Sequence, residues 1–264
     1  MVLVIDVGNT NIKYGVYEKG ELVASFRVAT TQTYTSDELG VVLINLLKQR
    51  NIKIENIEGI IISSVVPSLN YTMIHTCKDY LKKDALLVGP GIKTGLNIRV
   101  DNPREVGADR IVNCISAYKK YGESDSVKIV IDFGTATTFN VVTENCEFTG
   151  GAISPGIKSS LESLVNSTAK LPRIELSSPG TAIGKNTITN MQAGVIYGFA
   201  GLVDFIVRKM KEELKGKKTK VIATGGFSEV ISKEIESIDI VDKKLTLDGL
   251  YYVYELNKEN GGEI

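Results

Sequence analysis

The sequence has one histidine, no tryptophan and three cysteines in 264 residues. A HExxH metal site or the HRD loop of protein kinases cannot be built here, and we interpret His75 as a surface or packing residue of a predicted amphipathic helix. Cys77, Cys114 and Cys146 form no CxxC pair, so we expect buried apolar residues rather than a zinc site or disulfides. Any general base must therefore be a carboxylate, lysine, tyrosine or cysteine.

The sequence also lacks net charge and long apolar runs. Its 31 Lys and Arg residues balance 31 Asp and Glu residues, so nothing attracts it to nucleic acid or an anionic membrane. We find no uninterrupted apolar run near the ~18 residues that span a bilayer and no secretory signal pattern. We expect a cytoplasmic protein with no nucleic-acid and no membrane partner.

Two common nucleotide-binding fingerprints are missing as well. No GxxxxGK[ST] run occurs, which excludes a P-loop. Residues 89–95 (GPGIKTG) miss the GxGxxG spacing by one position, and Pro90 would disturb the turn, so we reject a dinucleotide fingerprint.

Two stretches of the chain resemble each other. Residues 4–17 are VIDVGNTNIKYGVY and residues 129–142 are IVIDFGTATTFNVV. Each is a short apolar run, an Asp-X-Gly turn and a second alternating run, which predicts a hairpin with a carboxylate at its mouth. The repeat, about half a chain apart, indicates two similar halves. Such a pair of turns is suited to a metal-complexed phosphate.

The first turn carries most of the polar groups. Gly8 has no Cβ to hinder a phosphate near the main chain. Asn9, Thr10 and Asn11 offer hydrogen bonds, and Lys13 offers a positive charge. The plainer interpretation is a tight Asn-rich turn with a surface lysine, and the second copy of the motif favours phosphate.

Two further segments are candidates for the site. Asp109 and Arg110 precede a predicted helix in a Gly/Pro-rich region, where Asp109 can accept a hydroxyl proton and Arg110 can bind an anionic group. A helix-start aspartate with a surface arginine is the simpler explanation of this pair. Thr224-Gly225-Gly226 follows a buried strand and suits close approach of an adenine or ribose, although such turns are common without a ligand.

The residue pattern predicts an α/β protein of two halves, residues 1–115 and 116–264. Strands are expected at 2–7, 12–18, 21–29, 59–64, 85–88, 127–132, 137–143, 147–153, 221–224 and 238–241. Helices are expected at about 35–49, 68–81, 110–121, 157–166, 187–214 and 247–257, and residues 89–110 are expected to be irregular.

The chain resembles the type III pantothenate kinases, members of the superfamily of sugar kinases, heat-shock chaperone ATPases and actin. Seven motifs in order carry the resemblance: DVGNTNIK (6–13), GPGIKTGLNI (89–98), NPREVGADRIVN (102–113), IDFGTATTFN (131–140), GGAISPG (150–156), IGKNT (183–187) and ATGGF (223–227). It implies a duplicated ribonuclease H-like, actin-like ATPase fold with mixed sheets and ATP between the halves. It also implies ATP-dependent phosphorylation of the primary hydroxyl of pantothenate to 4′-phosphopantothenate, the first step of coenzyme A synthesis.

The resemblance also implies roles for residues and cofactors. Asp109 is the expected base, Asp132 the expected ligand of K⁺ or NH₄⁺, and Asp6 the expected anchor of Mg²⁺ through water. The ATP-binding residues implied are Asp6, Val7, Gly8, Asn9, Thr10, Asn11, Ile12, Lys13 and Thr135. The substrate-binding residues implied are Val100, Gly107, Ala108, Asp109, Arg110 and Thr187. The family is dimeric, with the partner subunit closing the site.

One position departs from the family pattern. After GLNIR the family usually has a tyrosine that lines the pantothenate pocket, and this chain has Val100. Because of this departure, the protein could instead be a kinase that phosphorylates another small hydroxy acid or a sugar. The sequence is also compatible with a nucleotide-binding regulator or filament subunit without turnover, and with an α/β domain whose Asp-Gly turns are only turns. Asp109 argues against the regulator, because a binding protein needs no base there.

Overall fold

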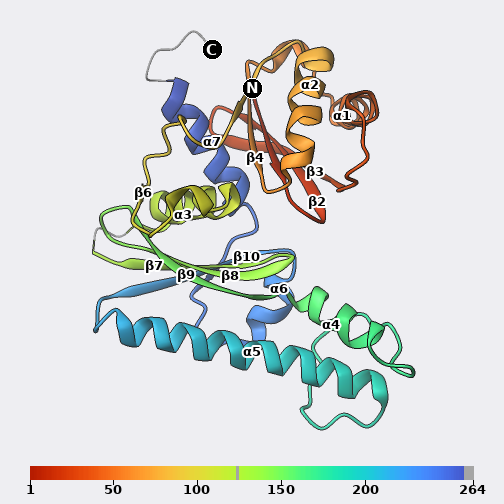
Figure 1. Ribbon diagram of the computed structural model, residues 1–264, viewed down its shortest axis with the longest axis vertical. Coiled ribbons are helices and arrows are strands. Elements are labelled where there is room, and N and C mark those ends of the chain that lie inside the picture. The colour runs from red at the N-terminus through yellow and green to blue at the C-terminus, as the bar shows by residue number, and fades with distance from the viewer. Residues whose placement is uncertain (123–124, 259–264) are drawn as a thin grey trace. The chain divides into compact units, whose positions relative to one another are not determined.

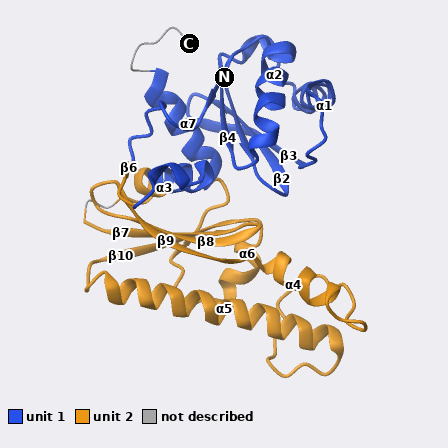
Figure 2. Ribbon diagram, in the orientation of Figure 1, with its two compact units in different colours: residues 1–96, 101–116, 245–264 blue, residues 97–100, 117–244 orange. Residues whose placement is uncertain are grey.

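The computed structural model describes residues 1–122 and 125–258, which form two compact units (Figure 2). Unit 1 contains Met1–Leu96, Asp101–Ser116 and the last helix of the chain. Unit 2 contains Asn97–Val100 and Ala117–Lys244. Each unit is built on its own sheet and is described separately below.

Unit 1 has a five-stranded sheet in the order β3-β2-β1-β4-β5 (Figure 1). Strands β1 and β2 are antiparallel, as are β2 and β3, whereas β1, β4 and β5 run parallel. Its elements are β1 (Val2–Val7), β2 (Asn11–Glu18), β3 (Glu21–Ala29), α1 (Ser36–Gln49), β4 (Gly59–Ser64), α2 (Asn70–Leu81), β5 (Ala85–Leu87), the first part of α3 (Ala108–Tyr121) and α7 (Leu245–Lys258), with single 3₁₀ turns at Ile54–Asn56, Pro67–Leu69 and Pro103–Glu105.

Burial follows strand position in this sheet. All of β1 is buried, because the strand lies in the middle of the sheet with both faces covered. β3, at the edge, alternates between exposed and half-buried residues. This two-residue period is typical of a strand with one face exposed to solvent. Helix α1 begins at a capping box in which Thr35 and Glu38 satisfy each other's backbone N–H groups.

Helices cover both faces of this sheet. Leu3 and Ile5 belong to the core cluster that includes Leu43 of α1 and Met73 of α2. The other face meets α7: a Cβ added at Gly59 would lie 1.9 Å from the Tyr254 hydroxyl oxygen. A larger residue at Gly59 would therefore force α7 away from β4.

Unit 2 has a six-stranded sheet in the order β11-β10-β7-β8-β9-β6. The long helix α5 lies along one face of this sheet (Figure 1), and its Val203 and Val207 share a core with Ile129 and Ile131 of β7. The elements are β6 (Asn97–Ile98), the end of α3, β7 (Val127–Phe133), β8 (Ala136–Val142), β9 (Glu147–Pro155), α4 (Ile157–Asn166), α5 (Thr187–Glu213), β10 (Thr219–Gly225), α6 (Ser228–Ile231), a 3₁₀ turn at Ser232–Glu234 and β11 (Ile240–Val241).

The two sheets share one topology. In unit 2 the strands β9-β8-β7-β10-β11 repeat the order and directions of β3-β2-β1-β4-β5 in unit 1. The predicted duplicated α/β fold with mixed sheets is confirmed, and β6 is an addition to the second copy. The turns that follow Asp6 and Asp132 occupy equivalent places, between the central strand and its antiparallel neighbour.

The structure corrects the expected extent of the second half. Helix α7 groups with unit 1, not with the residues that precede it. Its buried residues include Leu250 and Val253, and Gly249 packs so closely on α3 that an added Cβ would lie 2.0 Å from the Val112 carbonyl oxygen. The chain therefore returns to the first unit to complete its core. Segment 89–110 is also less irregular than expected, since it contains β6.

Two smaller expectations change. Cys77 and Cys114 are buried, as expected, but Cys146 is only half-buried, with a left-handed backbone (φ 57°). Helix α5 is long and apolar enough to cross a membrane by length and composition, contrary to our expectation that no segment would be. A core helix with one buried face passes the same test, so α5 is a weak indication of a membrane.

Candidate active site

Asp6 lies one residue before the end of the central strand β1 and is 6% exposed. Its carboxylate forms an ion pair with the Lys13 ammonium group (Nζ to Oδ2, 3.5 Å), which comes from the paired position of β2. The ion pair partly offsets the cost of burying the carboxylate. The register of the hairpin, set by the turn between the strands, thus brings these two residues together.

The turn itself uses some of the groups expected to bind phosphate. The Gly8 N–H donates to the Asn11 carbonyl oxygen at 3.1 Å, and the Thr30 hydroxyl donates to the Gly8 carbonyl oxygen at 2.6 Å. A Cβ at Gly8 would lie 3.1 Å from the same Asn11 oxygen, so this glycine serves the hairpin. Asn9 and Thr10 are exposed and Asn11 is half-buried, so their side chains are the accessible polar groups.

The side chains of Val7 and Ile12 are buried in the core of unit 1. Only their backbone groups can face a ligand. Val7 and Ile12, both expected to bind ATP, therefore use their side chains for packing in the core.

Asp109 lies in the first turn of α3, in the same unit as Asp6 and Lys13. One of its carboxylate oxygens accepts a hydrogen bond from the Arg110 N–H at 2.8 Å. A Cβ at Gly107 would lie 2.6 Å from that carboxylate, so the glycine leaves the space that Asp109 occupies. The same position is 3.6 Å from Val65, just beyond the end of β4, which places the start of α3 beside this end of the sheet.

Burial raises the pKa of the Asp109 carboxyl above its ordinary value. The Arg110 N–H, the Arg110 charge and the Lys13 charge oppose this shift. Burial also lowers the pKa of Arg110, although it remains a cation at any physiological pH. Lys13 therefore forms an ion pair with Asp6 and its charge also lowers the pKa of Asp109, so unit 1 holds both the Asp6–Lys13 turn and the candidate base.

In unit 2 the aspartate of the second Asp-X-Gly turn packs closely against Gly225 of β10. Asp132 lies next to the end of β7, and a Cβ at Gly225 would lie 2.5 Å from its carboxylate oxygen. Gly225 also has a left-handed backbone (φ 98°), so a side chain is disfavoured twice at this position. The Thr224-Gly225-Gly226 turn thus packs beside Asp132. This packing does not depend on the predicted contact with an adenine or ribose.

Thr135, the exposed residue of this turn, is supported through its backbone. Its carbonyl oxygen accepts a hydrogen bond from the Ser159 hydroxyl at 2.9 Å, at the start of α4. A Cβ at Gly156 would lie 2.2 Å from the same oxygen. The IDFGTATTFN and GGAISPG motifs are therefore neighbours in unit 2.

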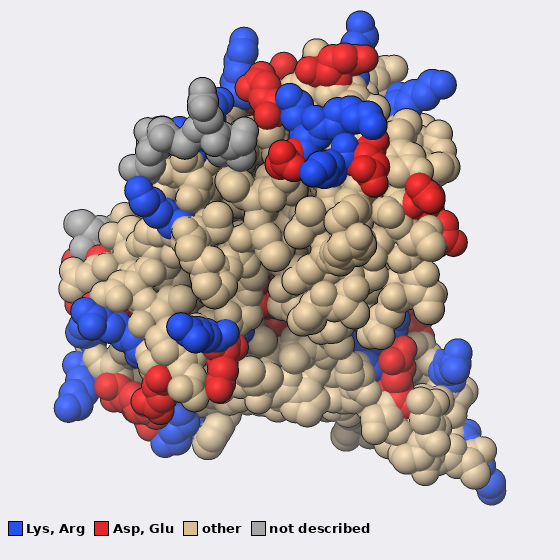
Figure 3. Space-filling view, turned by 45° about the horizontal axis from the view of Figure 1, so that its top comes forward, with Lys and Arg blue, Asp and Glu red and all other residues tan. Residues whose placement is uncertain are grey.

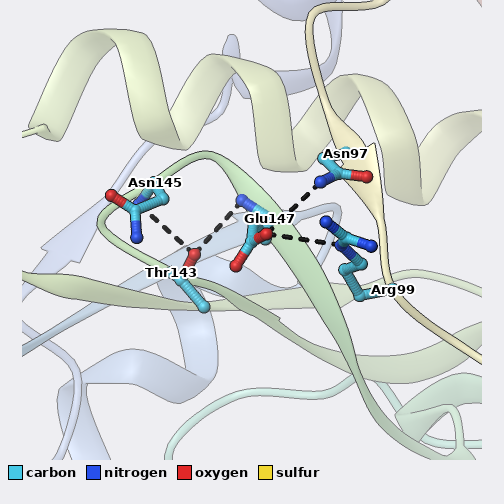
Figure 4. Close-up of polar contacts among 5 residues, drawn as sticks. All are labelled: Asn97, Arg99, Thr143, Asn145 and Glu147. Atoms are coloured by element: carbon cyan, nitrogen blue, oxygen red, sulfur yellow. Dashed lines mark hydrogen bonds and ion pairs between the residues drawn. The ribbon is translucent and has the colours of Figure 1, made fainter.

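Val100 follows β6, a strand of two residues that is joined to β9 by backbone pairing and by side-chain hydrogen bonds (Figure 4). A carboxylate oxygen of Glu147 accepts hydrogen bonds from Asn97 (3.3 Å) and from Arg99 (3.4 Å). The Arg99 N–H also donates to the Phe148 carbonyl oxygen at 2.8 Å. Sequence analysis missed Glu147, whose partners lie about 50 residues before it in the chain.

Thr187 is exposed at the first turn of α5, beside an apolar groove of about 680 Å³. The groove lies within unit 2, between α4 and α5. Its apolar lining consists of Leu164, Leu171, Met191, Val195, Phe199 and Leu202. The expected substrate residues are thus divided, with Gly107–Arg110 in unit 1 and Val100 and Thr187 in unit 2.

The charged groups are compatible with a divalent metal carried by a nucleotide. Over the described residues no group of three His, Cys, Asp or Glu side chains is placed to hold a metal. Mg²⁺ needs no such cage, because it is commonly bound by one or two carboxylates, water and substrate phosphates. Asp6, a single buried carboxylate at a strand end, fits that pattern. In the groups of charged side chains seen in Figure 3, Lys and Arg lie close to Asp and Glu, in keeping with zero net charge.

The duplicated sheets, each with an Asp-X-Gly turn after its central strand, form the fold of actin-like ATPases and sugar kinases. A model of the type III pantothenate kinases matches residues 2–209, and the chain belongs to that family. It is therefore an ATP-dependent kinase, a nucleotide-binding transferase that uses a divalent metal.

Solved structures share this fold at low sequence identity. A protein from Campylobacter jejuni described as a Baf family transcriptional activator is 21% identical, with a TM-score of 0.61 over 97% of this chain and 99% of that one. The activator of 2-hydroxyisocaproyl-CoA dehydratase from Clostridium difficile, with bound ADPNP, is 12% identical (TM-score 0.56; 100% and 97%). A ROK family glucokinase from Streptomyces griseus, with glucose and AMPPNP, is also 12% identical (TM-score 0.55; 98% and 99%).

Proposed function

We propose that the protein transfers the γ-phosphoryl group of ATP to the primary hydroxyl of pantothenate, giving 4′-phosphopantothenate and ADP. The observation that supports this most is the position of Lys13. It pairs with Asp6 of the phosphate turn and lies in the electrostatic range of Asp109. A cation near both a phosphate-binding turn and a carboxylate base suits phosphoryl transfer, because positive charge stabilises the transferring phosphoryl group.

In the proposed reaction Asp109 accepts the proton of the pantothenate hydroxyl as the oxygen attacks phosphorus. Its raised pKa brings it closer to neutral pH, where a general base is more effective. Its hydrogen bond to the Arg110 N–H fixes the carboxylate. Arg110 binds the carboxylate of pantothenate by charge. General-base catalysis of this kind contributes about 10²–10⁴-fold in rate.

Each unit contributes proposed phosphate-binding groups from its own Asp-X-Gly turn. Asn9, Thr10 and Asn11 donate to or accept from the nucleotide and its water, Lys13 neutralises phosphate charge, and Thr135 contributes from the second turn. Mg²⁺ held through water at Asp6 would neutralise charge on the β- and γ-phosphates. A monovalent cation at Asp132 is part of the proposal, and so are Thr187 and Val100 as contacts of pantothenate.

We also propose a homodimer in the cytoplasm, in which the partner subunit closes the site. Exposed apolar side chains support an interface on unit 2: Ile153 is 66% exposed and Ile188 at the start of α5 is 50% exposed. Contiguous exposed apolar surface is a mark of protein–protein contact. Light scattering coupled to gel filtration measures the assembly, and a monomer at all concentrations would contradict this part.

One incubation tests the function. The protein is mixed with ATP, Mg²⁺ and K⁺, with and without pantothenate, and phosphopantothenate is sought by mass spectrometry. A panel of hydroxy acids and sugars in the same assay tests for the different acceptor that Val100 leaves open. Binding of ATP, seen as a raised melting temperature, without phosphorylation of any acceptor would favour a nucleotide-binding regulator.

A further inference from the structure

Ser63, in the carboxyl-terminal part of β4, has a buried hydroxyl without a hydrogen-bond partner in the described chain. The residue is 0% exposed, and within residues 1–122 and 125–258 its Oγ finds no hydrogen-bond partner. The next residue, Ser64, differs, because its hydroxyl accepts from the Val66 N–H at 3.2 Å. A buried hydroxyl without a partner lowers stability relative to alanine. Burial alone does not assign a role to this hydroxyl, because Ser116 has one like it, so its role is inferred from where Ser63 lies.

The position of Ser63 indicates which group it serves. In the parallel pair of β1 and β4, Ser63 is the register partner of Asp6, and Lys13 is the register partner of Asp6 on the other side. Residues paired in this way point to the same face of the sheet. Adjacent strands are ~4.8 Å apart, so a rotation about the Ser63 side-chain bond brings its hydroxyl within reach of the Asp6 carboxylate.

Unit 2 shows the same placement independently. The register partner of Asp132 on the parallel strand β10 is Thr224, also a hydroxyl residue, which is 1% exposed. Both copies of the fold thus have a buried hydroxyl residue beside the carboxylate of the Asp-X-Gly motif. Apolar residues fill most of the remaining positions of these two central parallel strands, as expected for strands covered on both faces.

On this basis, and resting on the proposed kinase function, we propose that Ser63 is a positioning residue of the phosphate site. In the structure Lys13 pairs with Asp6. When nucleotide binds and Lys13 turns to its phosphates, the buried Asp6 carboxylate loses that partner. The Ser63 hydroxyl then donates to Asp6, which keeps in place the carboxylate that would hold Mg²⁺ through water.

Two serine-to-alanine variants separate function from packing. Ser116 in α3 is the matched control, because it is also 0% exposed, lies in unit 1 and has an Oγ without a partner in the described chain. Neither Ser63→Ala nor Ser116→Ala is expected to lower the melting temperature of the free protein. For Ser63→Ala we expect kcat to fall about tenfold, the effect of one hydrogen bond to an ionised group, with the KM for pantothenate unchanged.

A second readout does not need turnover. The rise in melting temperature with AMPPNP is measured against Mg²⁺ concentration, and Ser63→Ala is expected to need more Mg²⁺ for half of the full rise, whereas Ser116→Ala matches the wild type. The proposal is overturned if the two variants behave alike in both measurements. A wild-type protein that phosphorylates no acceptor would contradict the proposed function, while the AMPPNP measurement still decides the role of Ser63.

Discussion

The substitution Asp109→Asn separates charge from shape at the proposed base. Asparagine has nearly the same size and keeps a carbonyl oxygen to accept the Arg110 N–H, which is 2.8 Å from the Asp109 carboxylate. It cannot accept the proton of a hydroxyl. We expect kcat to fall by about 10²–10⁴-fold, which is an increase of roughly 2.7–5.4 kcal/mol in the activation free energy.

The same substitution is expected to leave stability unchanged or raise it. Burial raises the pKa of Asp109 in the folded protein. A carboxyl with a raised folded pKa contributes stability below its unfolded pKa of about 4, and that contribution is lost as pH rises through the folded value. At neutral pH the charged Asp109 therefore lowers the free energy of unfolding, and the asparagine variant avoids this. The difference in stability between the variant and the wild type should shrink toward pH 4.

Three measurements test this reasoning. Steady-state kinetics give kcat, melting curves at pH 4 and pH 7.5 give the stability difference, and the rise in melting temperature with ATP reports nucleotide binding, which we expect to be retained. Asp79→Asn, at an exposed aspartate of α2, is the control for loss of one negative charge in unit 1. Near-normal turnover of Asp109→Asn would remove this residue as the base.

Three further predictions concern unit 2. Activity should need K⁺ or NH₄⁺ and fail in Na⁺ alone, because of a cation site at Asp132; equal rates in Na⁺ and K⁺ buffers would contradict this. Val100→Tyr should raise the KM for pantothenate, because we expect the pocket to have repacked around valine, and a lowered KM would refute the repacking. Glu147→Gln should raise the same KM by less than about fivefold with kcat unchanged, since an exposed ion pair such as that with Arg99 contributes only about 0.2–1 kcal/mol.

The duplicated fold could be predicted because its signal is local. A strand, an Asp-X-Gly turn and a second strand are consecutive in the chain, so each copy is visible in 14 residues. The capping residues Thr35 and Asn186 likewise act on the turn that follows them. The place of α7 was not predictable in this way. Its apolar residues show that one face is buried, but not which sheet buries it, and the chain returns to the first unit at Leu245.

Prediction of the candidate site from the sequence is limited in the same way. The residue types at Asp6, Lys13 and Asp109 were identified from the sequence, but their common place in unit 1 depends on the packing of α3 beside the end of β4. The use of the Gly8 N–H within its own hairpin was missed, because a glycine in a turn indicates backbone freedom and not the partner of its N–H. The sequence around Ser63 shows only a serine at the end of an apolar strand. Many buried strands have such a serine, so the pattern alone does not indicate a functional residue.

The two copies of the motif differ at one position that decides their charge. Asp6 has a lysine, Lys13, as its antiparallel register partner, whereas Asp132 has Thr138. Unit 1 therefore carries an ammonium group beside its motif carboxylate, and unit 2 has a neutral hydroxyl at the equivalent place.

A monovalent cation at Asp132 would supply the charge that this position of unit 2 lacks. If so, Thr138→Lys should provide it internally and raise the rate in Na⁺ relative to the rate in K⁺, while Thr138→Met, with similar length and no charge, should not. Rates of all three proteins in Na⁺ and K⁺ buffers measure the ratio. A lysine variant as dependent on K⁺ as the wild type would show that the cation acts elsewhere than beside Asp132.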